Sequence, residues 1–183
     1  MSSGLRADAV RNRQLALEAA TQLLRESGAT LTVETIAKRA GLGAGTVVRA
    51  FGGKDALLDA AVSGLLQPVV DRAHELLETT APEQALRTFL AELIAFQSAN
   101  AGVNDRLGGL NLLATNALRA ELVRSVEEMV ARARRDGAIR TDLDPAVVTI
   151  LIGESAFAIA KASPGSGDLP AAFITVLMDG LRP

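Results

Sequence analysis

Residues 32–51 read TVETIAKRAGLGAGTVVRAF and carry the strongest local signal for a fold in the chain. Apolar residues recur at helical spacing on both sides of Gly41-Leu42-Gly43, which predicts two short helices, Val33–Ala40 and Ala44–Phe51. Thr32 can cap the first helix, and the small turn residues let the two helices approach closely. The pattern fits either a helix-turn-helix that enters the DNA major groove or an ordinary helical hairpin in a bundle.

The charge distribution favours a phosphate-facing N-terminal part. Residues 1–53 contain seven Lys/Arg and four Asp/Glu, whereas residues 54–183 contain twelve Lys/Arg and seventeen Asp/Glu. The whole chain has a net charge of −2. A positive end on an acidic body suits contact with nucleic acid, although ordinary surface variation gives the same balance.

The rest of the chain also reads as helix, so we predict an all-α protein of about nine helices. No segment of four to eight residues alternates apolar and polar side chains as a strand does. Pro68 should kink or interrupt the fourth helix, because proline removes a backbone donor. The remaining predicted helices are Ala9–Ser27, one from Lys54, one from a Thr80 cap to about Asn100, short or broken helix in 101–116, Ala117–Asp136, Pro145 to a stop at 163–165, and Asp168 to about Gly180.

Composition narrows the function classes. The chain has no cysteine, which excludes disulfides and thiolate metal sites, and a single histidine. It shows no catalytic constellation and no metal-ligand cluster, so we expect neither an enzyme nor a cofactor. The longest apolar run, Ala146–Ala162, is interrupted by Glu154 and is shorter than the roughly 20 residues of a membrane span. We therefore expect a soluble, cytoplasmic protein without a membrane partner.

Residues 19–58 resemble the N-terminal domain of TetR-family transcriptional regulators. Three motifs match in order: AA-x-x-L-L-x-E-x-G from Ala19, T-V-x-x-I-A-x-x-A-G from Thr32, and G-T-V-x-R-x-F-x-x-K-x-x-L-L from Gly45. The resemblance implies a repressor that binds a palindromic double-stranded operator as a homodimer and is released by a small-molecule effector. It places the DNA-binding domain at residues 1–53 and the effector-binding and dimerisation domain at residues 54–183.

Carried over by position, the resemblance assigns DNA contacts to the helix-turn-helix. Thr32 would cap its helix and approach a phosphate, Thr46 and Arg49 would contact the groove or phosphates, and Lys54 would bind a phosphate at a helix N-terminus. Arg49 could instead pair with Asp55 or Glu34, and Lys54 could be simply solvated. The full predicted set is Thr32, Ala44, Gly45, Thr46, Val48, Arg49 and Lys54.

The sequence also departs from the family pattern. Gly43 replaces the usual serine or threonine, Val48 replaces an aromatic residue, and Ala50 replaces a frequent histidine. These losses predict weaker DNA binding or a larger contribution from arginines near the N-terminus, Arg6, Arg11 and Arg13. They also leave open a ligand-binding or scaffold protein whose degenerate N-terminal domain no longer binds DNA.

Two C-terminal helices are apolar on nearly every side, which predicts that they are buried on every side. We expect them to form a four-helix dimer interface, although the core of a single chain explains the pattern too. The predicted interface residues are Val148, Ile152, Gly153, Ala156, Ile159, Phe173, Val176 and Leu177.

The middle helices would enclose the effector pocket, with apolar walls and a few orienting polar groups. The predicted lining is Phe89, Leu93, Phe96, Gln97, Asn100, Leu110, Leu113 and Glu154. Glu154 stands out because a carboxylate inside an apolar helix must be paired, protonated or facing a pocket.

Overall fold

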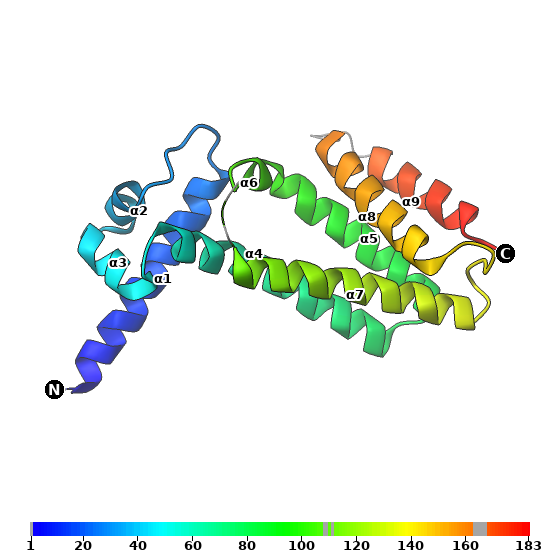
Figure 1. Ribbon diagram of the computed structural model, residues 1–183, viewed down its shortest axis with the longest axis horizontal. Coiled ribbons are helices and arrows are strands. Elements are labelled where there is room, and N and C mark those ends of the chain that lie inside the picture. The colour runs from blue at the N-terminus through cyan, green and yellow to red at the C-terminus, as the bar shows by residue number, and fades with distance from the viewer. Residues whose placement is uncertain (1, 108–109, 111, 163–167) are drawn as a thin grey trace. The chain divides into compact units, whose positions relative to one another are not determined.

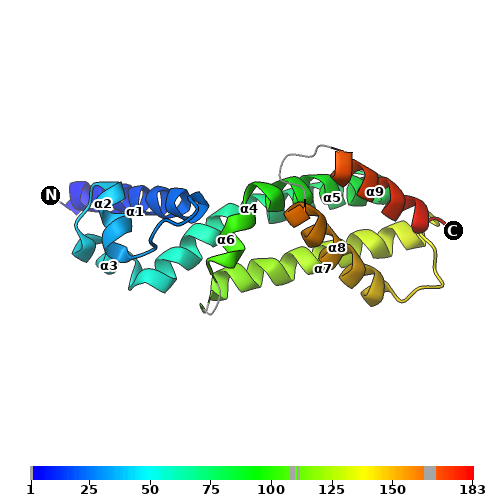
Figure 2. The same cartoon turned by 90° about the horizontal axis from the view of Figure 1, so that it is seen from above.

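The computed structural model describes residues 2–107, 110, 112–162 and 168–183, and this part of the chain is helical without strands, as predicted. Figures 1 and 2 show the helices from two directions. They are α1 (Ser2–Arg25), α2 (Val33–Ala40), α3 (Ala44–Phe51), α4 (Lys54–Thr79), α5 (Pro82–Ala99), α6 (Ala101–Asp105), α7 (Leu113–Arg135), α8 (Pro145–Ala162) and α9 (Asp168–Gly180).

The predicted boundaries of α2 and α3 are confirmed to the residue, whereas α1 and α7 begin earlier than predicted. Of the two predicted effects of Pro68, a kink or an interruption, the interruption is wrong, since α4 continues through Pro68 to Thr79. Proline leaves the carbonyl four residues earlier, that of Gly64, without its helical partner. Both Pro68 and Gly64 are exposed, so water can hydrate that carbonyl.

Thr80 does not cap α5, contrary to the prediction. Its amide donates to the carbonyl of Leu76 at 3.1 Å, so Thr80 completes the end of α4 instead. Ala81 occupies the cap position without a side-chain hydrogen bond, and Pro82 stands in the first turn, where its missing N–H costs nothing. Gly137, with φ of 71°, follows the end of α7 as predicted. The predicted stop at residues 163–165 lies outside the described residues.

The chain divides into two compact units. Unit 1 comprises residues 1–66 and 102–117, and unit 2 comprises residues 67–101 and 118–183. In unit 1, α2 and α3 pack on α1 and on each other. Its core is formed by small and branched apolar residues, including Ala16, Ala19, Ala20, Leu23, Leu24, Ile36, Ala37, Val47, Leu57, Leu58, Val103, Leu107 and Leu112.

Unit 2 is built around α5, on which both α8 and α9 pack. Phe89 and Leu90 of α5 are fully buried, together with Met129 of α7 and Ile152 of α8. Among the described helices, α8 alone is long and apolar enough to cross a membrane. Length and composition do not make it a membrane helix, because a core helix of a globular protein meets the same criteria.

Candidate nucleic-acid interface

The start of α2 is fixed by a local cap. Thr32 has an extended backbone, and its hydroxyl oxygen accepts a hydrogen bond of 3.1 Å from the amide of Thr35. This bond satisfies one of the amides that a helix N-terminus leaves without a partner. The side chain of Thr32 is half-buried and committed to this cap, which confirms the capping part of its predicted role.

The turn between α2 and α3 closes through glycine. Gly41 has φ of 68°, a left-handed conformation that favours glycine, and the amide of Leu42 donates to the carbonyl of Ala37 at 2.8 Å. Gly43 precedes α3 at the cap position and has no side chain to cap the helix. Its backbone carbonyl accepts a hydrogen bond of 2.9 Å from the amide of Thr46. The turn therefore sets the direction of α3 through the backbone alone.

The outer surface of α3 is small and carries one cation. Val47 is the buried residue of this helix, which leaves Thr46 half-buried and Gly45 and Arg49 exposed. A Cβ atom added to Gly45 would lie 3.8 Å from Nη1 of Arg49, so the guanidinium lies beside Gly45. No ion pair of Arg49 occurs within the described residues, so the predicted alternative partners Glu34 and Asp55 do not hold it.

The far end of α3 is fastened to α1 by Arg13. Its guanidinium donates to the carbonyl of Ala50 at 2.7 Å and stacks over the ring of Phe51, 4.2 Å from the centroid. A cation over an aromatic face is attracted by the ring quadrupole, and the carbonyl at the helix end accepts the donor. This contact spans 37 residues of sequence and fixes α3 on α1.

An ion pair ties α2 to the segment after α1. Arg39 donates to both carboxylate oxygens of Glu26, at 2.6 and 2.9 Å. The hydrogen bond from Arg39 holds the pKa of the Glu26 carboxyl below its usual value. The pair is solvent-exposed, so it adds little stability.

Two models of one protein family together match most of the chain. The model described as bacterial regulatory proteins of the tetR family matches residues 16–61, which include all of α2 and α3. A model of the C-terminal domain of SbtR-like transcriptional regulators matches residues 81–183. The chain belongs to the TetR family. It is therefore a DNA-binding transcriptional regulator, and its helix-turn-helix is α2 to α3.

Solved structures agree with this assignment. A TetR transcription regulatory protein from Mycobacterium vanbaalenii is 34% identical, over 98% of this chain and 99% of that one, with a TM-score of 0.66. The TetR regulator SCO0520 from Streptomyces coelicolor is 27% identical over 93% and 98%, with a TM-score of 0.65. FadR from Bacillus subtilis, solved with stearoyl-CoA, is 18% identical over 92% and 99%, with a TM-score of 0.77, and shares the fold. No curated protein matches the sequence.

The structure places the predicted DNA contacts of this TetR-family head on one short segment. Gly45, Arg49 and Val48 are exposed, and Val48 shows 44% of its surface. Ala44, Thr46 and Lys54 are half-buried, with Lys54 at the first position of α4. Their contacts with DNA stay a prediction.

Two side chains that sequence reasoning missed hold the segment 102–117 within unit 1. Arg106 donates to four carbonyls at and beyond the C-terminal end of α1, those of Leu23, Leu24, Glu26 and Ala29. The bonds to Leu24 and Glu26 are 3.1 and 2.8 Å long. Arg106 thus caps the end of α1, although no local sequence pattern marked it.

The second missed residue is Asp59 of α4. Its carboxylate accepts the amides of Ala114 and Thr115, both at 2.9 Å, and the hydroxyl of Thr115 at 2.7 Å. Burial would raise the pKa of Asp59, but these hydrogen bonds outweigh it and the pKa is lowered. Asp59 caps α7 from another helix, which explains why α7 begins at Leu113 rather than at the predicted Ala117.

The predicted pocket residues differ in burial and are divided between the two units. Phe89 is fully buried and Leu93 is 9% exposed in the core of unit 2, whereas Leu113 is 71% exposed. Glu154 is exposed on α8, so water can solvate its charge in the single subunit, and its pocket role stays a prediction. Leu110 and Leu113 belong to unit 1, while the half-buried residues of the prediction in unit 2 are Phe96, Gln97 and Asn100.

Three of the residues predicted for the dimer interface face the core of their own subunit. Val148 and Ile152 are 1% exposed and Ala156 is fully buried. The single-chain core therefore explains these three residues, and their interface role is corrected. Ile159, Phe173 and Leu177 are partly buried against the same core, whereas Gly153 and Val176 are exposed.

Proposed function

We propose that the protein is a repressor that binds a palindromic operator as a homodimer and releases it when a small molecule binds unit 2. The observation that carries the proposal is the exposed guanidinium of Arg49, which lies beside Gly45 and forms no ion pair with a described residue, on the second helix of a TetR-family helix-turn-helix. In such units this helix reads base edges in the major groove, while neighbouring groups bind phosphates. A bacterial regulator of this kind acts in the cytoplasm, and we propose no enzymatic activity for it.

The outward face of α8 supports a homodimer. Its exposed large apolar residues are Val147, Ile150, Leu151 and Phe157, with exposed fractions of 49, 63, 54 and 40%. On α9, Val176 is 72% exposed. Exposure of this much apolar surface to water is unfavourable, and a second copy of the chain packed on this face would bury it. These residues replace the buried ones of the original interface prediction.

Charge on the same face suggests how the copies meet. Glu154 and Lys161 are both exposed and stand two helical turns apart on α8. An antiparallel copy related by a twofold axis would bring Glu154 of each subunit to Lys161 of the other. A twofold dimer presents two α3 helices to two half-sites, about one DNA turn apart.

A half-buried glutamine in unit 2 supports a ligand with a hydrogen-bond donor. The side-chain oxygen Oε1 of Gln97 is buried without a partner within the described residues. A buried acceptor that lacks a donor costs about 1–3 kcal/mol, which a bound hydroxyl or N–H group would recover. The structural relatives solved with stearoyl-CoA and with resorcinol share this fold and bind small molecules.

Release would be a shift in population between two states. In one state the two DNA-binding domains of the dimer are spaced for the operator, and in the other they are not. An effector that binds the second state better weakens operator binding by its coupling free energy. A coupling of about 1–3 kcal/mol lowers operator affinity roughly 5- to 150-fold.

The experiment is a binding titration with a duplex that the protein itself selects from a random pool. We expect a palindromic footprint, steep loss of affinity with salt, and about a hundredfold loss in the Thr46→Ala/Arg49→Ala variant, since each base contact contributes about 1–3 kcal/mol. Arg87→Ala/Arg124→Ala removes two positive charges from unit 2 as a control. Selection of no duplex would favour the scaffold protein with a degenerate N-terminal domain.

A further inference from the structure

The first turns of α1 extend beyond the core that the rest of this helix helps to form. The helix begins at Ser2, and from Arg6 onward its first buried residue is Ala16. Every residue from Arg6 to Arg11 is exposed, and Val10 shows 70% of its surface. The ten residues that precede Ala16, from Arg6 to Leu15, correspond to about 15 Å of helix, and in Figure 1 this part of α1 runs past α3.

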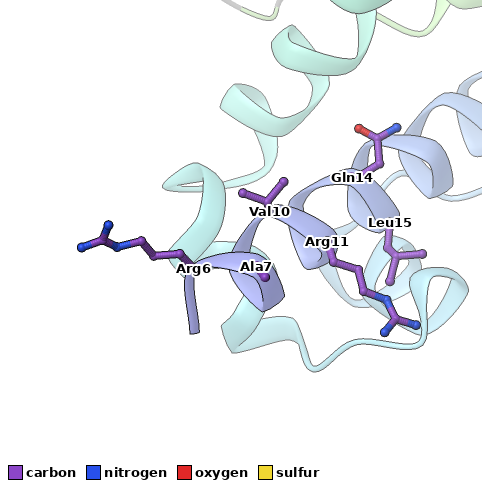
Figure 3. A pocket seen from close by; sticks show the side chains of 6 residues that line it. All are labelled: Arg6, Ala7, Val10, Arg11, Gln14 and Leu15. Atoms are coloured by element: carbon purple, nitrogen blue, oxygen red, sulfur yellow. The ribbon is translucent and has the colours of Figure 1, made fainter. Parts of the chain in front are cut away.

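This extension carries unpaired cations around a shallow apolar hollow. The hollow is lined by Arg6, Ala7, Val10, Arg11, Gln14 and Leu15, and Figure 3 shows the guanidinium groups of Arg6 and Arg11 pointing away from each other. Neither group pairs with a described residue, and Asp8 is the single acidic residue between positions 6 and 14. The small side chain of Ala7 leaves room for a partner to approach between the two cations.

The extension is anchored to the helix that reads DNA. Arg13, at its base, bonds the carbonyl of Ala50 at 2.7 Å and stacks on Phe51 at the end of α3. The position of residues 6–11 is therefore fixed relative to α3, because both belong to unit 1 and Arg13 joins them.

The surface of α3 itself offers few donors. Gly43 provides no side chain at its start, Gly45 has none, and Val48 exposes only carbon. A DNA-binding domain with one arginine on this helix needs phosphate contacts elsewhere, because the neutralisation of phosphates by cations supplies much of the affinity for DNA.

We propose that Arg6 and Arg11 form a second DNA contact, each binding a backbone phosphate next to the half-site that α3 reads. The proposal rests on the function proposed above, in which α3 is the reading helix. Charge complementarity and continuity with α3 through Arg13 identify duplex DNA as the partner. An acidic protein surface is the alternative occupant, and binding to DNA distinguishes the two.

The test measures affinity against salt concentration for the full-length protein and the selected duplex. For Arg6→Ala/Arg11→Ala we expect affinity to fall about tenfold or more near 0.1 M salt, and the slope of log K against log salt to decrease by about 2 for each bound subunit. Hydroxyl-radical protection should disappear beside the half-site and persist within it. Arg6→Lys/Arg11→Lys keeps both charges, so it should retain most of the slope.

Arg87→Ala/Arg124→Ala is the matched control, because it removes two arginines of unit 2 that form no ion pair with a described residue. It should leave the slope and the footprint unchanged. All variants should melt at the wild-type temperature, since Arg6 and Arg11 support no other residue. Wild-type slope and footprint in Arg6→Ala/Arg11→Ala would overturn this second contact, while the Thr46→Ala/Arg49→Ala variant tests the reading helix separately.

Discussion

Asp59 on α4 accepts both the amide and the hydroxyl of Thr115 at the start of α7, at 2.9 and 2.7 Å. The two residues are 56 positions apart in sequence. A carboxylate at a helix N-terminus satisfies free amides and complements the helix dipole. This pair attaches the start of α7 to unit 1.

Replacing Asp59 by asparagine should destabilise the protein by about 1–2 kcal/mol, because a neutral amide accepts fewer and weaker hydrogen bonds. Urea unfolding followed by circular dichroism measures this. Asp71→Asn is the control: Asp71 is exposed and accepts only Gln67 at 2.9 Å, which asparagine can still do. Equal effects of the two substitutions would contradict the capping role of Asp59.

The same pair predicts an acid response. The pKa of Asp59 is lowered in the folded protein, so its contribution to stability is full above the unfolded-state pKa of about 4. It is lost as the pH falls through the folded-state pKa. The difference in unfolding free energy between wild type and Asp59→Asn should therefore be constant from pH 5 to 7 and shrink as the pH falls below about 4. A difference that grows on acidification would show the opposite linkage.

The two glycines of the turn should respond in opposite directions to serine. Gly43 has φ of −76°, and an added Cβ atom would lie 3.9 Å from Oγ1 of Thr46, an ordinary contact, so Gly43→Ser adds a cap to α3 and stabilises by a few tenths of a kcal/mol. Gly41 has φ of 68°, and Gly41→Ser forces a left-handed serine that costs about 1 kcal/mol. Thermal melting of both variants compares them, and a stabilising Gly41→Ser would refute the strain at this position.

Removing the Arg106 side chain should destabilise unit 1 by about 2–3 kcal/mol, since four carbonyls lose a charged donor. Arg106→Lys should recover only part of this loss, because an ammonium group cannot span the positions that the planar guanidinium reaches. Hydrogen exchange of the last turn of α1 would localise the effect. Arg124→Ala, at an exposed position of α7, should change neither stability nor exchange.

The proposed twofold pairing on α8 predicts a charge-swap rescue. Glu154→Lys and Lys161→Glu should each weaken self-association about tenfold or more, since each places like charges together. The double variant Glu154→Lys/Lys161→Glu should restore it. Sedimentation equilibrium at several concentrations measures the dissociation constants, and single variants that associate like wild type would refute the pairing.

The sequence by itself determined the helix-turn-helix. Thr32, Gly41 and Gly52 set the ends of α2 and α3 through hydrogen bonds to residues three to five positions away, so the pattern of nearby residues was sufficient. The family motifs lie in the same stretch, so the DNA-binding function could also be predicted from it.

Only the tertiary structure decided which side of α8 is covered and where α7 begins. The apolar pattern of α8 is nearly uniform, so periodicity could not separate buried Ile152 from exposed Ile150. Asp59 and Arg106 act on helix ends 56 and up to 83 residues away. Contacts of this kind depend on how helices pack, and no local spacing of residues encodes them.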